Sequence, residues 1–397
     1  DGGECSATAI RARIKKLVDE GVVCRNAKIG YAYPQRSSGF ATIATGSFPS
    51  MHGVVSDQWY DRLSSGLTSA IEHTGYHGVG GESGNGRYAP HHLMASTTGD
   101  EMKLMNRHSK VYSLGLHPAS AVLGAGKMSD GAFWFEDETA NWMTNTFYMD
   151  SLPRWVRDFN GKDLENLYMD RKWELSHPED TYTASTADDH ESEEGFMLLY
   201  RHQFPYNLKT LRRKAHGYKY LKHTPFGNTY TKDFALALIT NEKLGEDKHT
   251  DLINIAFSAS AYVNQLFGPR SVEMEDLYLR LDHVAGPHRA EEFQRLPHVD
   301  RAMSGQLLAD HRRDQPRSQH AMRDAPLEDG VLRIIFVQVN RVMIGRDLGE
   351  HLDVAVGHDF AQVTGHAHLD ILDADGPARH VIQHNHPPAG MAQSFAL

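Results

Sequence analysis

The sequence predicts an α/β fold in which helices cover both faces of a central, mostly parallel sheet. Three apolar runs, residues 110–116, 251–258 and 331–339, have the length and composition of buried strands. Residues 232–244 and 271–282 have the apolar spacing of helices and lie between these runs in the chain. Strands that alternate with helices in this way are typical of parallel βαβ units.

The other expected elements follow in chain order. Residues 10–18 have helical spacing, and residues 22–24 begin an extended segment. Residues 36–53 are small and rich in glycine, which predicts a tight turn that leads into a helix N-terminus, where unpaired backbone N–H groups favour anions. Residues 132–159 hold aromatic side chains at mixed spacing, which we interpret as helical packing. Residues 176–195 are polar and acidic and form a surface excursion.

Length, composition and charge restrict the class of protein. The chain has 397 residues, of which 40% are hydrophobic, enough for one large α/β domain or two ordinary ones. The net charge of −10 argues against a general nucleic-acid binder, but it allows a small phosphate ester at one local site. No apolar run approaches the roughly 18 residues of a membrane span, and no signal peptide is visible. Cys5 and Cys24 can pair if the protein is secreted and are otherwise free or buried thiols.

The composition changes near residue 283. No Lys occurs after Lys248, and no Tyr, Trp or Cys occurs after Tyr278, whereas His, Arg, Ala, Gly and Asp dominate. We therefore divide the chain into a core, residues 1–283, and a divergent C-terminal part, residues 284–397. Two explanations of that part stay open: a genuine sequence that completes the same domain, or a segment read partly out of frame in a GC-rich gene.

Six segments in the first two-thirds of the chain carry a family resemblance. They read SSGFATIATGSFPSMHGVVSDQWYD (37–61), LMASTTGDEMKL (93–104), SDGAFWFEDETANWMT (129–144), STADDHESE (185–193), KHTPFGNTYTKDFALALI (222–239) and YVNQLFGPRSVEMEDLYLRLD (262–282). In this order they resemble the zinc-dependent bacterial alkaline phosphatases of the type I phosphodiesterase/nucleotide pyrophosphatase-like branch of the alkaline phosphatase superfamily. The resemblance covers residues 1 to about 283.

The resemblance implies a three-layer sandwich and a phosphate-ester hydrolase that is periplasmic or secreted and acts on a small phosphate ester. A Ser or Thr oxygen attacks phosphorus, while two zinc ions activate this nucleophile and stabilise the leaving oxygen. The implied zinc ligands are Asp1, whose supporting strand would precede the chain, Asp310 and His311 in the segment LADH, and His366 in the segment TGH. Carboxylate oxygens and imidazole nitrogens are common ligands of zinc ions in proteins.

The resemblance also implies a nucleophile and a substrate-binding set. Counting back from Thr45 and Gly46 places Arg36 at the nucleophile position, and a shift of one residue places Ser37 there, which we take as the candidate. Phe40 stands where the family has a His. The implied substrate-binding positions are Asp57, where the family has an Asn, and His117, where it has a Lys. A carboxylate at position 57 is expected to repel a phosphoryl dianion.

Three further positions depart from the family pattern. Ala261 and Gln265 replace an Asp and a His that bind the first zinc, and Ala119 replaces an Arg that grips phosphate. We therefore expect one or two zinc ions with reduced binding. Two functions remain open: a hydrolase that uses the family mechanism, or an inactive pseudoenzyme of the same fold with a binding or structural role. The sequence does not distinguish a monoester from a diester substrate.

Overall fold

The computed structural model describes most of residues 29–284 and three short strands outside this range. The described residues are 22–23, 29–62, 65–81, 86–191, 193–200, 202–284, 334–339 and 355–356. The expected helix over residues 10–18 lies outside them, as does most of the C-terminal part.

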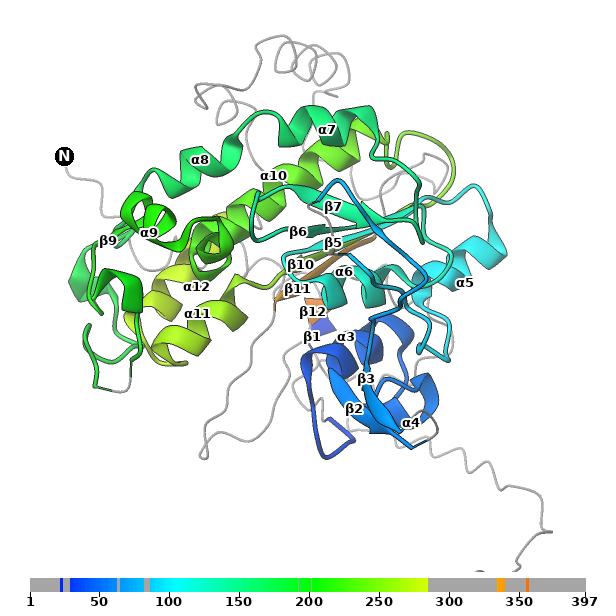
Figure 1. Ribbon diagram of the computed structural model, residues 1–397, viewed down its shortest axis with the longest axis horizontal. Helices are drawn as coiled ribbons and strands as arrows, with labels where there is room; N and C mark the ends of the chain where they lie inside the picture. The colour runs from blue at the N-terminus through cyan, green and yellow to red at the C-terminus, as the bar shows by residue number, and fades with distance from the viewer. Residues whose placement is uncertain are drawn as a thin grey trace, which may run out of the picture.

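The centre of the fold is a six-stranded sheet (Figure 1). In spatial order its strands are β11 (Ile334–Val339), β10 (Leu252–Phe257), β5 (Val111–Gly115), β6 (Gly131–Phe135), β7 (Trp142–Asn145) and β4 (Gly78–Val79). The first four strands are parallel, and β7 and β4 continue the sheet in antiparallel pairs. The prediction of a mostly parallel sheet is therefore confirmed.

Helices cover both faces of the sheet, as the sequence predicts. One side holds α7 (Arg154–Asn160), α8 (Leu164–Met169), α9 (Leu208–Ala215), α10 (Pro225–Asn241), α11 (Ala259–Phe267) and α12 (Val272–Val284), and the other holds α3 (Arg36–Thr45), α5 (Thr98–Met105) and α6 (Pro118–Ala125) (Figure 1). Strand β6 shows the two faces directly. Phe133 and Phe135 belong to the aromatic core under α10, while Ala132 and Trp134 belong to the core with α3 and α6. The period of two follows from the pleat of the strand.

Smaller elements complete the described part. They are the strand pairs β1 (Val22–Val23) with β12 (Ala355–Val356), β2 (Gln58–Asp61) with β3 (Gly66–Ser69), and β8 (Lys172–Trp173) with β9 (Tyr206–Asn207), the helix α4 (Pro49–His52), and the 3₁₀ turns η1 (Glu179–Thr181), η2 (Met197–Leu199) and η3 (Lys219–His223). No helix among the described residues has the length and apolar character needed to cross a membrane.

Two sequence interpretations are corrected by the structure. Residues 132–159 are not chiefly helical, because they contain β6 and β7 and only end in a helix, α7. Their aromatic residues alternate between two cores, which is a strand pattern. The segment 36–53 is itself a helix from Arg36, rather than a turn that leads into one. The expected strand in residues 331–339 is confirmed as β11, but the rest of the C-terminal part lies outside the described residues, so both explanations of its composition stay open.

Candidate active site at the carboxyl edge of the sheet

The carboxyl ends of β5 and β10 lie side by side in the sheet, because these strands are parallel neighbours. Strand β5 leads into α6 through His117, and β10 leads into α11 through Ser258. Helix α3 packs on α6 and brings its N-terminal residues toward this edge. In open parallel α/β sheets, ligands bind outside the carboxyl ends of the strands. The candidate site is built from these three helix starts.

Two of the predicted residues, Ser37 and Asp57, are in contact at the N-terminus of α3. Ser38 fixes the start of the helix, because its Oγ accepts a hydrogen bond from the Gln35 N–H at 3.0 Å. Ser37 is only 2% exposed. Its backbone N–H donates to Oδ1 of Asp57 at 2.7 Å. The carboxylate thus occupies the position where the helix dipole and unpaired N–H groups stabilise negative charge.

Phe40 and Ala119 lie next to this helix start but contribute no polar group. Both side chains are buried, at 2% and 1% exposure, in the apolar core between α3 and α6. The positions where the resemblance implies a His and an Arg are therefore packing positions in this chain.

His117 caps α6 and is neutral. Its Nδ1 accepts the Ala119 N–H at 3.1 Å. Burial, and then the charges of Arg36 and Lys222, lower the pKa of His117 to about 3. Since Nδ1 acts as an acceptor, the single ring proton resides on Nε2, which makes this edge of the ring a hydrogen-bond donor. The predicted residue His117 thus lies close to two cations.

Two residues that the sequence did not single out, Lys222 and Tyr262, connect these cations. The Arg36 Cζ lies 5.5 Å and the Lys222 Nζ 4.8 Å from the centroid of the Tyr262 ring. Tyr262 is 7% exposed, and its hydroxyl has no hydrogen-bond partner within the described residues. Lys222 also pairs with Asp137 at 2.6 Å. Both residues stand in segments that carry the family resemblance, but their meeting depends on three separate elements, α3, η3 and α11.

The structure does not describe the four predicted metal ligands, which are Asp1, Asp310, His311 and His366. Within the described ranges, no group of three or more His, Cys, Asp or Glu side chains is arranged to hold a metal ion. The described part of the site therefore does not by itself supply the ligands for a zinc ion.

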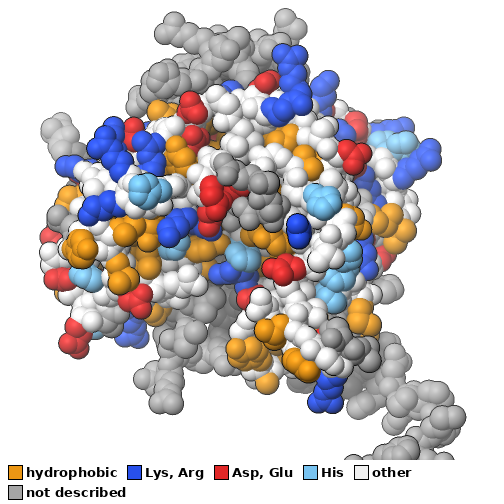
Figure 2. All heavy atoms as spheres, in the orientation of Figure 1, with side chains coloured by type: hydrophobic (Ala, Val, Ile, Leu, Met, Phe, Trp, Pro, Cys, Tyr) orange, Lys and Arg blue, Asp and Glu red, His pale blue; other side chains and the backbone are white. Residues whose placement is uncertain are grey.

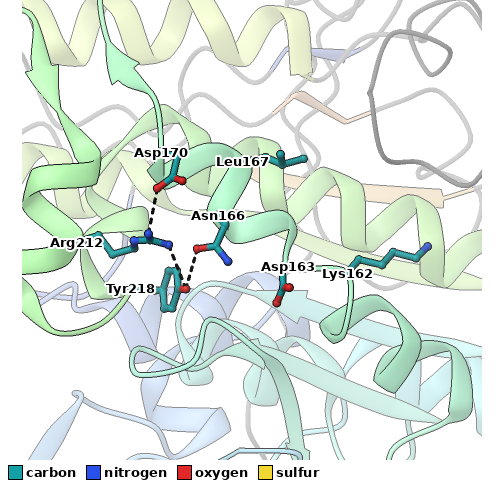
Figure 3. A pocket seen from close by; sticks show the side chains of 7 residues that line it. All are labelled: Lys162, Asp163, Asn166, Leu167, Asp170, Arg212 and Tyr218. Atoms are coloured by element: carbon teal, nitrogen blue, oxygen red, sulfur yellow. Dashed lines mark hydrogen bonds and ion pairs between the residues drawn. The ribbon is translucent and has the colours of Figure 1, made fainter.

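A separate polar groove lies between α8 and α9 (Figure 3). It measures about 760 Å³, and none of its lining residues belongs to the carboxyl edge. Figure 3 shows Arg212 between Asp170, at 3.0 Å, and Tyr218, whose hydroxyl donates to Asn166 at 2.9 Å. These charges already pair with one another. None of the residues that line this groove has a buried side-chain polar atom without a partner, in contrast to Tyr262 at the carboxyl edge.

The face of the molecule shown in Figure 2 has no large patch of only positive or only negative side chains. In Figure 2, basic and acidic side chains are interspersed over the face, and apolar side chains gather near α4 and β2. The exposed apolar side chains of this part of the chain include Met51, Tyr60 and Leu67. The positive charges of Arg36 and Lys222 are therefore a local feature of the site.

The fold and this cationic edge define an α/β protein with a candidate anion site at the ends of its parallel strands. Residues 10–291 match the family model "type I phosphodiesterase / nucleotide pyrophosphatase", and the chain belongs to this family. The predicted membership of the alkaline phosphatase superfamily is confirmed.

Curated relatives and solved structures agree with this assignment. The chain is 36% identical over 269 residues to alkaline phosphatase PhoV of Synechococcus elongatus, covering 68% of this chain and 48% of PhoV. It is 35% identical over 272 residues to alkaline phosphatase PafA of Elizabethkingia meningoseptica, covering 68% of this chain and 49% of PafA. A crystal structure of wild-type PafA superposes with a TM-score of 0.66 at 33% identity, covering 69% of this chain and 53% of that one. The chain thus spans about half the length of these relatives.

Proposed function

We propose that the protein is a phosphate-ester hydrolase of the alkaline phosphatase type, which converts a small phosphate ester and water into an alcohol and phosphate. Family membership over residues 10–291 and the names of its relatives support this proposal. The observation that carries it at the site is the convergence of Arg36, Lys222 and neutral His117 at the carboxyl edge of the sheet.

In the chemistry proposed for this edge, Ser37 Oγ attacks phosphorus while the bond from phosphorus to the ester oxygen breaks and the alcohol leaves. Water then hydrolyses the phosphoserine and releases phosphate. The position of Ser37 in the first turn of α3 places it beside Arg36, whose charge would stabilise the negative charge that develops on the phosphoryl oxygens. The Nε2–H of His117 would donate a further hydrogen bond to these oxygens. The Asp57 carboxylate, which accepts the N–H of the buried Ser37, would repel a phosphoryl group bound at this helix start.

The test is hydrolysis of p-nitrophenyl phosphate and bis-p-nitrophenyl phosphate by the full chain, with and without added zinc. The comparison of the two substrates separates monoesterase from diesterase activity. Ser37→Ala should abolish turnover, and Ser151→Ala, at an exposed serine, serves as a matched control. Binding of phosphate without turnover would instead favour the pseudoenzyme, for which Phe40, Ala261 and Gln265 are the residues in support.

Zinc binding and compartment belong to the same proposal. One or two zinc ions, held by Asp1, Asp310, His311 and His366, remain a prediction with reduced affinity expected from Ala261 and Gln265. Elemental analysis after chelation and reloading should find at most one tightly bound zinc per chain. A periplasmic or secreted location is proposed from the family resemblance and is tested by fractionation of cells that express the complete gene.

We also propose that residues 284–397 complete the same domain as residues 1–283. The parallel pairing of β11 with β10 supports this organisation. A reading-frame check of the coding DNA, together with limited proteolysis, separates a packed segment from out-of-frame sequence, since cleavage requires locally opened backbone.

A further inference from the structure

We propose that Arg36, Lys222 and Tyr262 form the grip for a dianionic phosphate group in this chain, in place of residues that follow β5. This inference rests on the proposed function and deepens it by naming the residues that would hold the substrate. It assigns a binding role to Lys222 and Tyr262, which the sequence did not single out.

The first argument is that the polar groups gathered here are mainly hydrogen-bond donors. Arg36 and Lys222 carry only donors, and the ring proton of His117 resides on Nε2. The hydroxyl of Tyr262 is buried without a partner among the described residues. A buried donor that lacks an acceptor destabilises the protein, because it has lost its hydrogen bonds to water. A ligand that fits such a set must supply acceptors and negative charge, and a phosphate dianion supplies both.

The second argument is that more unpaired polar atoms lie one helical turn away. Asn228 and Ser258 are 1% and 2% exposed, and Asn228 Nδ2 and Ser258 Oγ have no partner within the described residues. The amide of Asn228 cannot be reversed, because its Oδ1 accepts the Ala259 N–H at 3.1 Å. Ser258 precedes Tyr262 by four residues, so both lie on one side of the α11 start. Asn228 and Ser258 therefore add two buried polar groups without partners, among the described residues, at the start of α11.

The third argument concerns the balance of charge. The two cations lie over one aromatic ring, which attracts each of them, but they also repel each other. Asp137 neutralises Lys222 at 2.6 Å, whereas Arg36 has no ion pair among the described residues. The Asp57 carboxylate lies at the start of α3, where it accepts the Ser37 N–H. Arg36 therefore supplies the unpaired charge, and Lys222, which is paired with Asp137, supplies further N–H donors.

The experiment measures binding, separately from turnover, by isothermal titration calorimetry of the full chain. The probes are inorganic phosphate and phenylphosphonate, a stable analogue of a phosphate ester. Arg36→Met and Lys222→Met keep the aliphatic stems and remove the charges, and Tyr262→Phe keeps the ring. Arg154→Met is the matched control, because Arg154 is an exposed cation in a surface pair with Asp158 at 3.6 Å.

We expect phosphate binding to weaken about tenfold or more in Arg36→Met and less in Tyr262→Phe, since charge-assisted hydrogen bonds contribute more than neutral ones. Arg154→Met should bind as the unmodified chain does. If phenylphosphonate binds as tightly as phosphate, the site accepts esters; if only phosphate binds, it is a site for the free anion. Circular dichroism of each variant checks the fold, and Tyr262→Phe, the mildest change, keeps the test decisive if a charge variant does not fold.

Two results would overturn the grip. One is an unmodified chain that binds neither probe, and the other is equal affinity in Arg36→Met, Lys222→Met and the unmodified chain. Both differ from a failure of the proposed function. If the unmodified chain hydrolyses the ester and the Arg36 and Lys222 variants bind phosphate with unchanged affinity, only the proposed grip is refuted. If phosphate binding depends on Arg36 but no ester is hydrolysed, only the proposed hydrolase function is refuted.

Discussion

Asp57→Asn separates two roles of one carboxylate, because it removes a charge but keeps an acceptor. The Oδ1 that accepts the Ser37 N–H at 2.7 Å is retained in the amide. What is lost is a negative charge beside the place that a phosphoryl group would occupy. We therefore expect phosphate binding to strengthen, while the start of α3 becomes less stable.

The magnitudes follow from this geometry. Two unit charges about 4 Å apart interact by about 4 kcal/mol at the effective dielectric constant of a protein surface. Asp57 is half-buried, so water and salt reduce this repulsion to about 1–2 kcal/mol, or roughly tenfold in affinity. The helix loses the favourable interaction of a charged group with its N-terminus, about 0.3–1 kcal/mol, which lowers the Tm by a few degrees.

Calorimetric titration with phosphate and thermal unfolding without it measure the two effects on the same samples. Asp158→Asn is the control, because Asp158 is an exposed carboxylate in the Arg154 pair, and its loss should change neither quantity. Unchanged or weaker phosphate binding in Asp57→Asn would falsify the argument that this carboxylate opposes the anion. An unchanged Tm would show that the Ser37 contact does not stabilise α3.

Three further predictions concern other parts of the chain. Burial raises the pKa of Glu273 to about 8 in the folded protein, above the unfolded value of 4.5. The stabilisation by protonated Glu273 is therefore full below pH 4.5 and is lost as the pH rises through about 8. Glu273→Gln should flatten the fall of the urea unfolding midpoint between pH 4.5 and 8, whereas the control Glu275→Gln should not. Asp276→Ala should lower the unfolding free energy by about 3 kcal/mol or more in urea titrations, because it strands the buried Trp173 N–H and the Arg280 charge, each bonded to Asp276 at 2.7 Å. Ala261→Asp combined with Gln265→His should raise phosphatase activity, and no gain would indicate that the nucleophile position at the start of α3 is also altered.

Local patterns predicted much of the fold. The apolar runs at β5, β10 and β11 were identified because a strand buried on both faces needs apolar side chains on both. Strands β6 and β7 were missed, because the alternation of Phe133 and Trp134 between the two cores spans only a few residues. The helical spacing of α12 was recognised from its apolar face.

The sequence predicted those site residues that could be identified one at a time, from their positions in the family motifs. Ser37, Asp57 and His117 were candidates by position, and the structure brings the first two into contact and places His117 beside Arg36. Lys222 and Tyr262 have no local signal of a shared site, because they lie on η3 and α11 and meet Arg36 only through the tertiary fold.

The position of β10 between β5 and β11 affects how the protein must be synthesised. Strand β10 pairs along its length with β11 on one side and with β5 on the other. Until residues 334–339 leave the ribosome, the apolar β10 is an open edge strand, with unpaired N–H and C=O groups that can pair with other chains. Contacts between strands so distant in sequence form slowly. The nascent chain therefore has an aggregation-prone interval that ends only when β11 closes this edge.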